Sequence, residues 1–160
     1  MYSYVIKEMI KFFKNDKKRI AHSLKVFAYA QTLCELENLG FETSKIAILS
    51  AILHDVGIKI AEKKHNSSAG RYQELYGGEI AENILNDLNY DKNIIKNVKF
   101  NISNHHHPNA SESIDFRILI ESDYIVNFEE EDIPLKSLDQ IIEKQFKTKS
   151  GKEIINTIFK

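Results

Sequence analysis

The chain contains very few residues that would interrupt a helix. Its 160 residues include only two prolines, Pro108 and Pro134, and six glycines. Apolar residues recur at the three- and four-residue steps that place side chains on one face of a helix, and no segment alternates like a half-buried strand. A chain of this length, 42% apolar, can bury one hydrophobic core. We therefore expect an all-α, single-domain helical bundle over residues 1–160.

Capping and breaking residues predict where the helices end. Asn15 or Asp16 is expected to cap the second helix, and Thr43 or Ser44 the third. The segment 59–78 is polar and contains Gly77-Gly78, so we expect a long functional loop with a short helical piece at 71–75. The predicted helices cover residues 3–13, 17–38, 44–55, 79–88, 91–103, 114–128, 135–146 and 151–159.

Composition excludes several classes of function. The net charge of −1 lacks the basic excess of a nucleic-acid-binding protein. A single cysteine, Cys34, cannot form an intramolecular disulfide, which favours a reducing, cytoplasmic location. Neither a signal-peptide pattern nor a membrane-spanning apolar run is visible. We therefore expect no nucleic-acid partner and no membrane partner.

Four polar groups interrupt helix faces that are otherwise apolar. His54-Asp55 ends the apolar run 46–53, His22 begins an apolar stripe on the second helix, and Asp123 lies on the buried side of a later helix. Each alone is most simply a hydrogen-bonded core residue, but an apolar core rarely holds four such groups without a shared partner. Two imidazoles and two carboxylates predict one divalent transition metal, Mn, Fe, Co or Ni, with Mg less favoured.

The ordered set His22, His54-Asp55 and Asp123 resembles the H…HD…D signature of the HD-domain superfamily of metal-dependent phosphohydrolases. Residues 53–57 read LHDVG, which is similar to the LHDIG form of the motif, and residues 120–123 are similar to the helix that carries the last aspartate. The segment 67–74 resembles small single-domain bacterial members. The resemblance implies a bundle of the HD-domain type, with a motif-bearing core at about 17–128 followed by C-terminal helices at about 135–159.

Additional histidines are part of the same resemblance. In the branch that binds two metals, a histidine precedes a glycine by four residues, as in HPEIG. Matching 77–81 to that pattern puts Gly77 in the histidine's place, so we expect one metal. His105 and His106 lie where many members carry further histidines, and they are candidates for phosphate donors, a general acid or ligands of a second metal. Consecutive residues point in different directions, so these two and His107 cannot all face one pocket.

Basic residues follow the His54-Asp55 pair closely. Lys59, Lys63 and Arg71 are candidates for binding substrate phosphate, with Arg71 preferred because a guanidinium can bind phosphate through two hydrogen bonds. The alternative is that these side chains are simply solvated. Glu79 is a candidate for activating water, and with Asp55, His105 and His106 it completes the candidate catalytic residues.

These observations, with the resemblance, predict a metal-dependent phosphohydrolase that acts on a small phosphorylated molecule by attack of activated water, with a nucleotide as the favoured substrate. Two alternatives stay open. One is a metal- or nucleotide-binding regulatory module without catalysis. The other, less favoured, is an oxygenase with a two-iron centre. The apolar faces of the helices in 135–159 also make a homodimer an option.

Overall fold

A computed structural model describes residues 1–160 and contains helices without any strand. The all-α prediction is therefore confirmed. Nine helices follow one another along the chain: α1 (Ser3–Phe13), α2 (Lys17–Leu36), α3 (Phe41–Leu53), α4 (Ile58–His65), α5 (Gly70–Asp87), α6 (Lys92–Asn104), α7 (Ile114–Glu130), α8 (Leu135–Gln145) and α9 (Lys149–Phe159).

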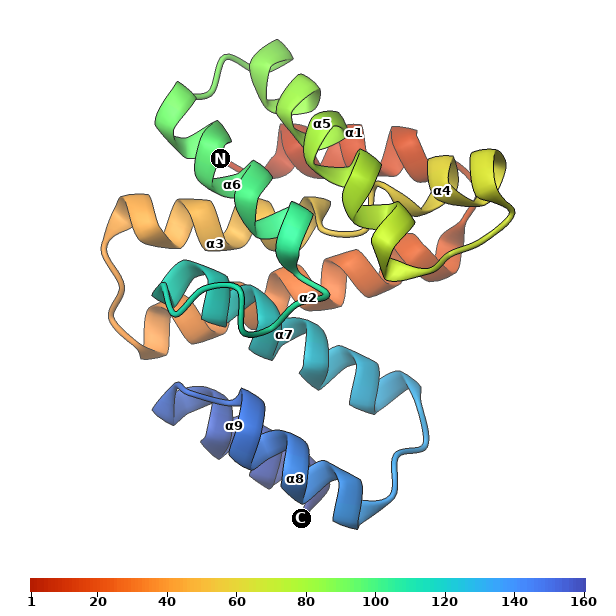
Figure 1. Cartoon of the computed structure of the whole chain (residues 1–160). Helices are drawn as coiled ribbons and strands as arrows, with labels where there is room; N and C mark the ends of the chain where they lie inside the picture. Colours follow the sequence, from red (N-terminus) through yellow and green to blue (C-terminus); the bar gives the residue numbers. More distant parts are fainter.

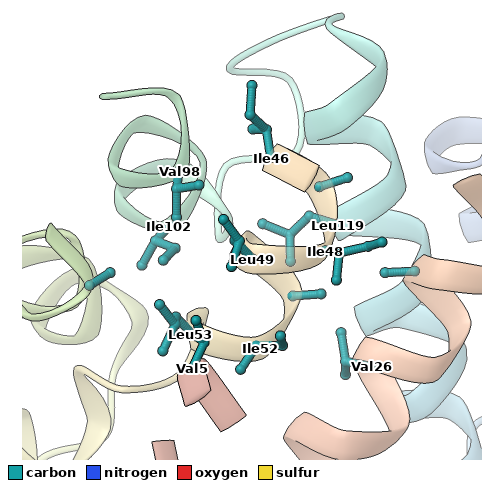
Figure 2. Close-up of a cluster of buried hydrophobic side chains, with 14 of the residues drawn as sticks. Val5, Val26, Ile46, Ile48, Leu49, Ile52, Leu53, Val98, Ile102 and Leu119 are labelled. Atoms are coloured by element: carbon teal, nitrogen blue, oxygen red, sulfur yellow. The ribbon is translucent and has the colours of Figure 1, made fainter. Parts of the chain in front are cut away.

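Helix α3 lies at the centre of the bundle. Helices α1, α5 and α6 lie on one side of it and α2 and α7 on the other, with α8 and α9 beyond α7 (Figure 1). Every residue of α3 from Ile46 to Leu53 is buried. Figure 2 shows Leu49, Ile52 and Leu53 of this helix pointing toward side chains from the helices around it. The centre of the core thus fixes where the end of α3, with His54 and Asp55, is held.

Helix ends are set by local chemistry. The Asp16 side chain caps α2 by accepting a hydrogen bond from the backbone N–H of Arg19 at 3.2 Å, as one of the two predicted caps. Helices α2 and α5 both end before an asparagine in the left-handed conformation, Asn38 (φ 53°) and Asn89 (φ 57°). In each case the following N–H bonds a carbonyl five residues back, which satisfies the last turn.

The predicted start of the third helix was wrong by one turn. The helix begins at Phe41, with Gly40 in extended conformation as its N-cap, and the Ser44 N–H already bonds the Gly40 carbonyl. The Ser44 hydroxyl instead donates to the Leu39 carbonyl at 3.3 Å. A side chain that resembles a cap therefore closes the preceding turn rather than starting the helix.

The long loop predicted for 59–78 was also wrong. Helix α4 occupies most of its first half, and α5 begins at Gly70 and runs straight through Gly77-Gly78. These glycines allow close packing. A Cβ on Gly77 would lie 3.0 Å from the Ile102 side chain, and one on Gly78 would lie 2.2 Å from the Ser103 hydroxyl. The pair lets α5 approach α6 closely, an effect of tertiary packing that overrides helix propensity.

The C-terminal pair α8–α9 packs on α7 around a second, smaller apolar cluster, which comprises Ile125, Phe128, Leu138, Ile142, Phe146 and Ile155. Most apolar side chains of these two helices pack in or against this cluster, whereas Leu135 and Ile158 are exposed, so the homodimer stays a prediction. Buried polar groups of α7 hold the same pair. The Glu121 carboxylate accepts hydrogen bonds from the backbone of Lys147 and Thr148, and the Arg117 guanidinium donates to the Gln145 carbonyl.

No helix in the structure combines the length and apolarity that a membrane crossing requires.

Candidate metal site and pocket

The four groups singled out in the sequence converge at one point. The Nε2 atoms of His22 and His54 lie 3.2 Å apart, and Asp123 Oδ1 lies 3.2 Å from the first and 3.5 Å from the second. Asp55 Oδ2 lies 3.6 Å from His22 Nε2 and 3.4 Å from His54 Nε2. Donor atoms of His22, His54 and Asp123 all lie within 4.8 Å of one another, so these three residues could hold one ion.

The outer nitrogen of each imidazole is bound to a fixed partner. His54 Nδ1 lies 2.8 Å from the Ala51 carbonyl, which can only accept, so this nitrogen carries the proton. His22 Nδ1 lies 2.9 Å from a carboxylate oxygen of Glu130. Because Nδ1 of each ring is bonded outward, the Nε2 atoms of both rings face each other and are available to bind a metal. Such outer partners fix the tautomer and orientation of metal-binding histidines.

Charge in this cluster is balanced between acids and imidazoles. Burial disfavours the imidazolium of His54 and would lower its pKa. The negative charges of Asp55 and Asp123 have the larger effect and raise the pKa of His54 well above its usual range. Burial likewise acts against the ionised acids, but His54 and its neighbours hold the pKa of Asp55 and of Asp123 below the usual range. Both carboxylates are therefore ionised at neutral pH, which is the form that binds a cation.

A divalent transition metal fits this donor set. Two imidazole nitrogens and two carboxylate oxygens suit Mn²⁺, Fe²⁺, Co²⁺ or Ni²⁺ better than Mg²⁺, which prefers oxygen ligands. The buried imidazole of His105 is a further nitrogen donor beside this set and also favours a metal site. His105 Nδ1 donates to the Ile102 carbonyl at 2.7 Å, and its buried Nε2 has no hydrogen-bond partner and lies 3.7 Å from Asp55 Oδ1.

A pocket of about 390 Å³ opens over the cluster. This volume lies at the lower end of the range for small-molecule sites. Ten of its eleven lining residues are polar or charged, so the pocket suits a polar ligand: Asp16, Lys18, Arg19, His22, Asp55, Ile58, Gln73, His106, Asp123, Asn127 and Glu130.

The candidate substrate residues do not line this pocket. The Lys59 ammonium donates to the Phe13 carbonyl, and Lys63 is exposed in the last turn of α4. Arg71 is exposed and stacks on Tyr72, with its guanidinium carbon 4.6 Å from the ring centre. Glu79 is exposed on α5. Of the three neighbouring histidines, His105 reaches the cluster and His106 lines the pocket, while His107 is exposed and pairs with Glu74.

A model of the HD-domain family matches residues 19–150, which include all four of these groups. The chain belongs to the HD-domain family. The crystal structure of a "predicted HD superfamily hydrolase" from an uncultured Thermotogales bacterium superposes with a TM-score of 0.68 at 20% identity. That match covers 98% of this chain and 84% of the other, and at this identity it shows the HD-domain fold alone. No curated protein matches the chain.

The position assigned to Gly77 in the HD-domain pattern needs correction. Gly77 packs against Gly57 and Ile102, and its Cβ position faces backbone and an apolar side chain rather than the pocket. Gln73, which precedes Gly77 by the same four-residue step, lines the pocket and bonds His106. A glutamine amide therefore stands where the two-metal pattern of the HD domain has an imidazole.

Several pocket residues were not predicted, although helix periodicity marks them. Arg19 precedes His22 by three residues, Asn127 follows Asp123 by four and Glu130 follows it by seven, so each shares a helix face with a member of the cluster. Counting outward from the HD-domain signature residues in helical steps would have found all three. Glu130 lies in the acidic run 129–132, and its carboxylate bonds His22 at 2.9 Å.

Replacing Glu130 by glutamine is expected to weaken metal binding about tenfold, since partners of ligating histidines typically contribute this much or more. The amide keeps a hydrogen-bonding group near His22 Nδ1 but removes the charge that holds the imidazole. Competition with a coloured chelator measures the change, and Glu131→Gln, at an exposed neighbour, is the matched control. Equal affinities in the two variants would contradict the role of Glu130.

Proposed function

We propose that the protein is a metal-dependent phosphohydrolase that releases phosphate or pyrophosphate from a small phosphorylated molecule of the nucleotide class. The observation that carries the proposal is the convergence of His22, His54, Asp55 and Asp123 at the floor of a polar pocket. Membership of the HD-domain family supports a hydrolase with a divalent metal.

The residues of the cluster have three different roles: holding the metal, orienting water and orienting the imidazoles. His22, His54, Asp55 and Asp123 would hold the ion, which when bound supplies Lewis acidity toward a phosphoryl oxygen and toward water. Asp55 also faces His105, so its carboxylate can orient a water molecule between the cluster and the pocket. Glu130 and the Ala51 carbonyl keep the imidazole lone pairs aimed inward. The geometry thus leaves the pocket side open for substrate.

Phosphate recognition requires cations, and Arg19 and Lys18 supply them at this pocket. The Arg19 guanidinium is held by Asp16 at 2.7 Å and by Glu62 at 2.5 Å, which orients it on the face of α2 that carries His22. A phosphorylated substrate would compete with these carboxylates for its N–H groups. Arg19 therefore takes the role that the sequence suggested for Arg71.

Arg19→Met is expected to lower kcat/KM by about 10- to 100-fold, mainly through KM, because a hydrogen bond to a charged group contributes about 1.5–3 kcal/mol. Arg71→Met is the matched control and should leave kinetics unchanged, since Arg71 stacks on Tyr72 away from the pocket. Steady-state phosphate release measures both. A larger loss in Arg71→Met would return the phosphate contact to that residue.

The test of the function combines elemental analysis with a substrate panel. About one transition metal per chain, with phosphate or pyrophosphate release from nucleotides or sugar phosphates under Mn²⁺, Co²⁺ or Ni²⁺, is the expected result. Metal bound without turnover across the panel would favour the binding module instead. Two irons per chain in anaerobically purified protein would favour the oxygenase, and a chain that takes up no metal would refute the site.

A further inference from the structure

His106 is held by a side chain that has no place in the metal cluster. Its Nε2 lies 3.0 Å from Gln73 Oε1, and Gln73 Nε2 lies 2.5 Å from the Ser68 carbonyl. Gln73 is only 8% exposed. Its neighbour Glu74 accepts a hydrogen bond from the His106 backbone N–H at 3.1 Å. Hydrogen bonds from two residues near the start of α5 thus hold His106 in the turn that follows α6.

The direction of these hydrogen bonds follows from the Ser68 carbonyl. A carbonyl oxygen only accepts, so the amide nitrogen of Gln73 must face Ser68 and its amide oxygen must face His106. An amide oxygen also only accepts. His106 Nε2 must therefore carry a proton, and in a neutral ring the other nitrogen, Nδ1, then holds a lone pair.

That lone pair is left for the pocket. Gly70 packs against the Cβ, Cγ and Cδ2 atoms of His106, since a Cβ at Gly70 would lie 2.8 Å from Cγ and 2.9 Å from Cδ2, and Nδ1 is not among these closest contacts. No protein group bonds Nδ1, and His106 lines the pocket. The ring nitrogens of His106 bond an amide oxygen and no carboxylate, so the imidazole is in its neutral form above the ordinary pKa of about 6.5. A neutral acceptor attracts O–H donors and not phosphate oxygens.

We propose that Gln73 is a positioning residue that fixes His106 with its proton on Nε2, so that Nδ1 accepts a hydrogen bond from an O–H group in the pocket. The O–H group belongs either to the attacking water or to a hydroxyl of the substrate. This second part rests on the proposed function, whereas the protonation pattern of the ring does not. His54 and His105 differ from His106 in that their Nδ1 atoms face carbonyls and therefore carry a proton.

The tautomer is tested by nuclear magnetic resonance of the imidazole nitrogens in the full-length protein near neutral pH, with His106→Asn for assignment. The expected spectrum shows His106 protonated at Nε2, with a proton signal protected from exchange with water. Gln73→Met, which has similar length but no acceptor, should lose that protected signal. Gln73→Glu, which keeps an acceptor oxygen, should retain it, and Gln31→Met on the surface of α2 should change nothing. A His106 proton on Nδ1, or a signal unaffected by Gln73→Met, would overturn the proposal.

Kinetics with paired nucleoside monophosphates separates the two donors. If the O–H group is water, Gln73→Met should lower kcat/KM up to about tenfold for ribose and deoxyribose substrates alike, the range expected for one neutral hydrogen bond. If it is the ribose hydroxyl, the loss should be confined to the ribose substrate. Unchanged kcat/KM for both would overturn the acceptor role. A wild-type protein that hydrolyses neither substrate would count against the proposed function, while the spectra still decide the role of Gln73.

Discussion

Asp55→Ala is expected to abolish hydrolysis, with a loss of about 1000-fold or more in kcat/KM, or about 4 kcal/mol of transition-state stabilisation. The reason is the double role of one carboxylate. Its Oδ2 lies within 3.6 Å of both His22 Nε2 and His54 Nε2, and its Oδ1 faces His105. Alanine removes a ligand and leaves the imidazoles without the charge that balances them. Metal stoichiometry and turnover of the purified variant measure the two effects together.

The matched control for Asp55→Ala is Asp87→Ala, which removes an exposed carboxylate near the end of α5. It should keep both metal and activity. A third variant, Asp55→Asn, keeps the shape of the side chain and removes its charge, so it should bind metal weakly and remain inactive. Clean Asp55→Ala protein that still hydrolyses substrate at the wild-type rate would refute the catalytic site proposed for this chain.

Gly57→Ala is expected to destabilise the fold by about 3 kcal/mol, at the upper end for overpacked positions. A Cβ at this position would lie 2.2 Å from the Gln73 carbonyl oxygen and 2.8 Å from the Gly77 nitrogen. Both atoms are backbone, so neither can turn aside as a side chain would, and α5 must shift as a whole. For a chain of this length the loss corresponds to a fall of roughly 10 °C in Tm. Thermal unfolding followed by circular dichroism measures it.

Gly40→Ala is the control for this effect. Nothing lies within 4 Å of a Cβ at Gly40, which only caps α3. The expected loss is about 0.5–1 kcal/mol, from the poorer capping by alanine. Because a shift of α5 would also move Gln73, Gly57→Ala should additionally disturb His106. Similar melting temperatures for the two variants would show that α5 relaxes away from Gly57 at little cost.

The sequence predicted those features that depend on one helix at a time. Apolar periodicity identified every helix except α4 and the first half of α5, and Asp16 was correctly considered as a cap. The long-loop prediction failed because glycine has two uses: Gly77 and Gly78 resemble a break, yet they serve contact between α5 and its neighbours. That use depends on a partner far away in the chain and leaves no local signal.

The same distinction applies to the site. His22, His54 and Asp123 could be found because a polar residue on an apolar face stands out within its own helix. Arg71 and Lys59 were chosen by closeness in sequence to His54-Asp55, which says little about which way a helix turns its side chains. Arg19 lines the pocket, unlike Arg71 and Lys59, because it shares a face of α2 with His22. Gln73 also lines the pocket, because α5 packs against the turn at Gly57.

Helix α7 serves two parts of the molecule at once. One of its faces presents Asp123 to the pocket, and Glu121, two residues earlier, grips the connection between α8 and α9. A side chain at Gly151 would collide with the same Glu121 carboxylate. The pair α8–α9 is therefore coupled to the metal cluster, because a change there that displaces Glu121 acts on the same helix that carries Asp123, one of the cluster's two aspartates.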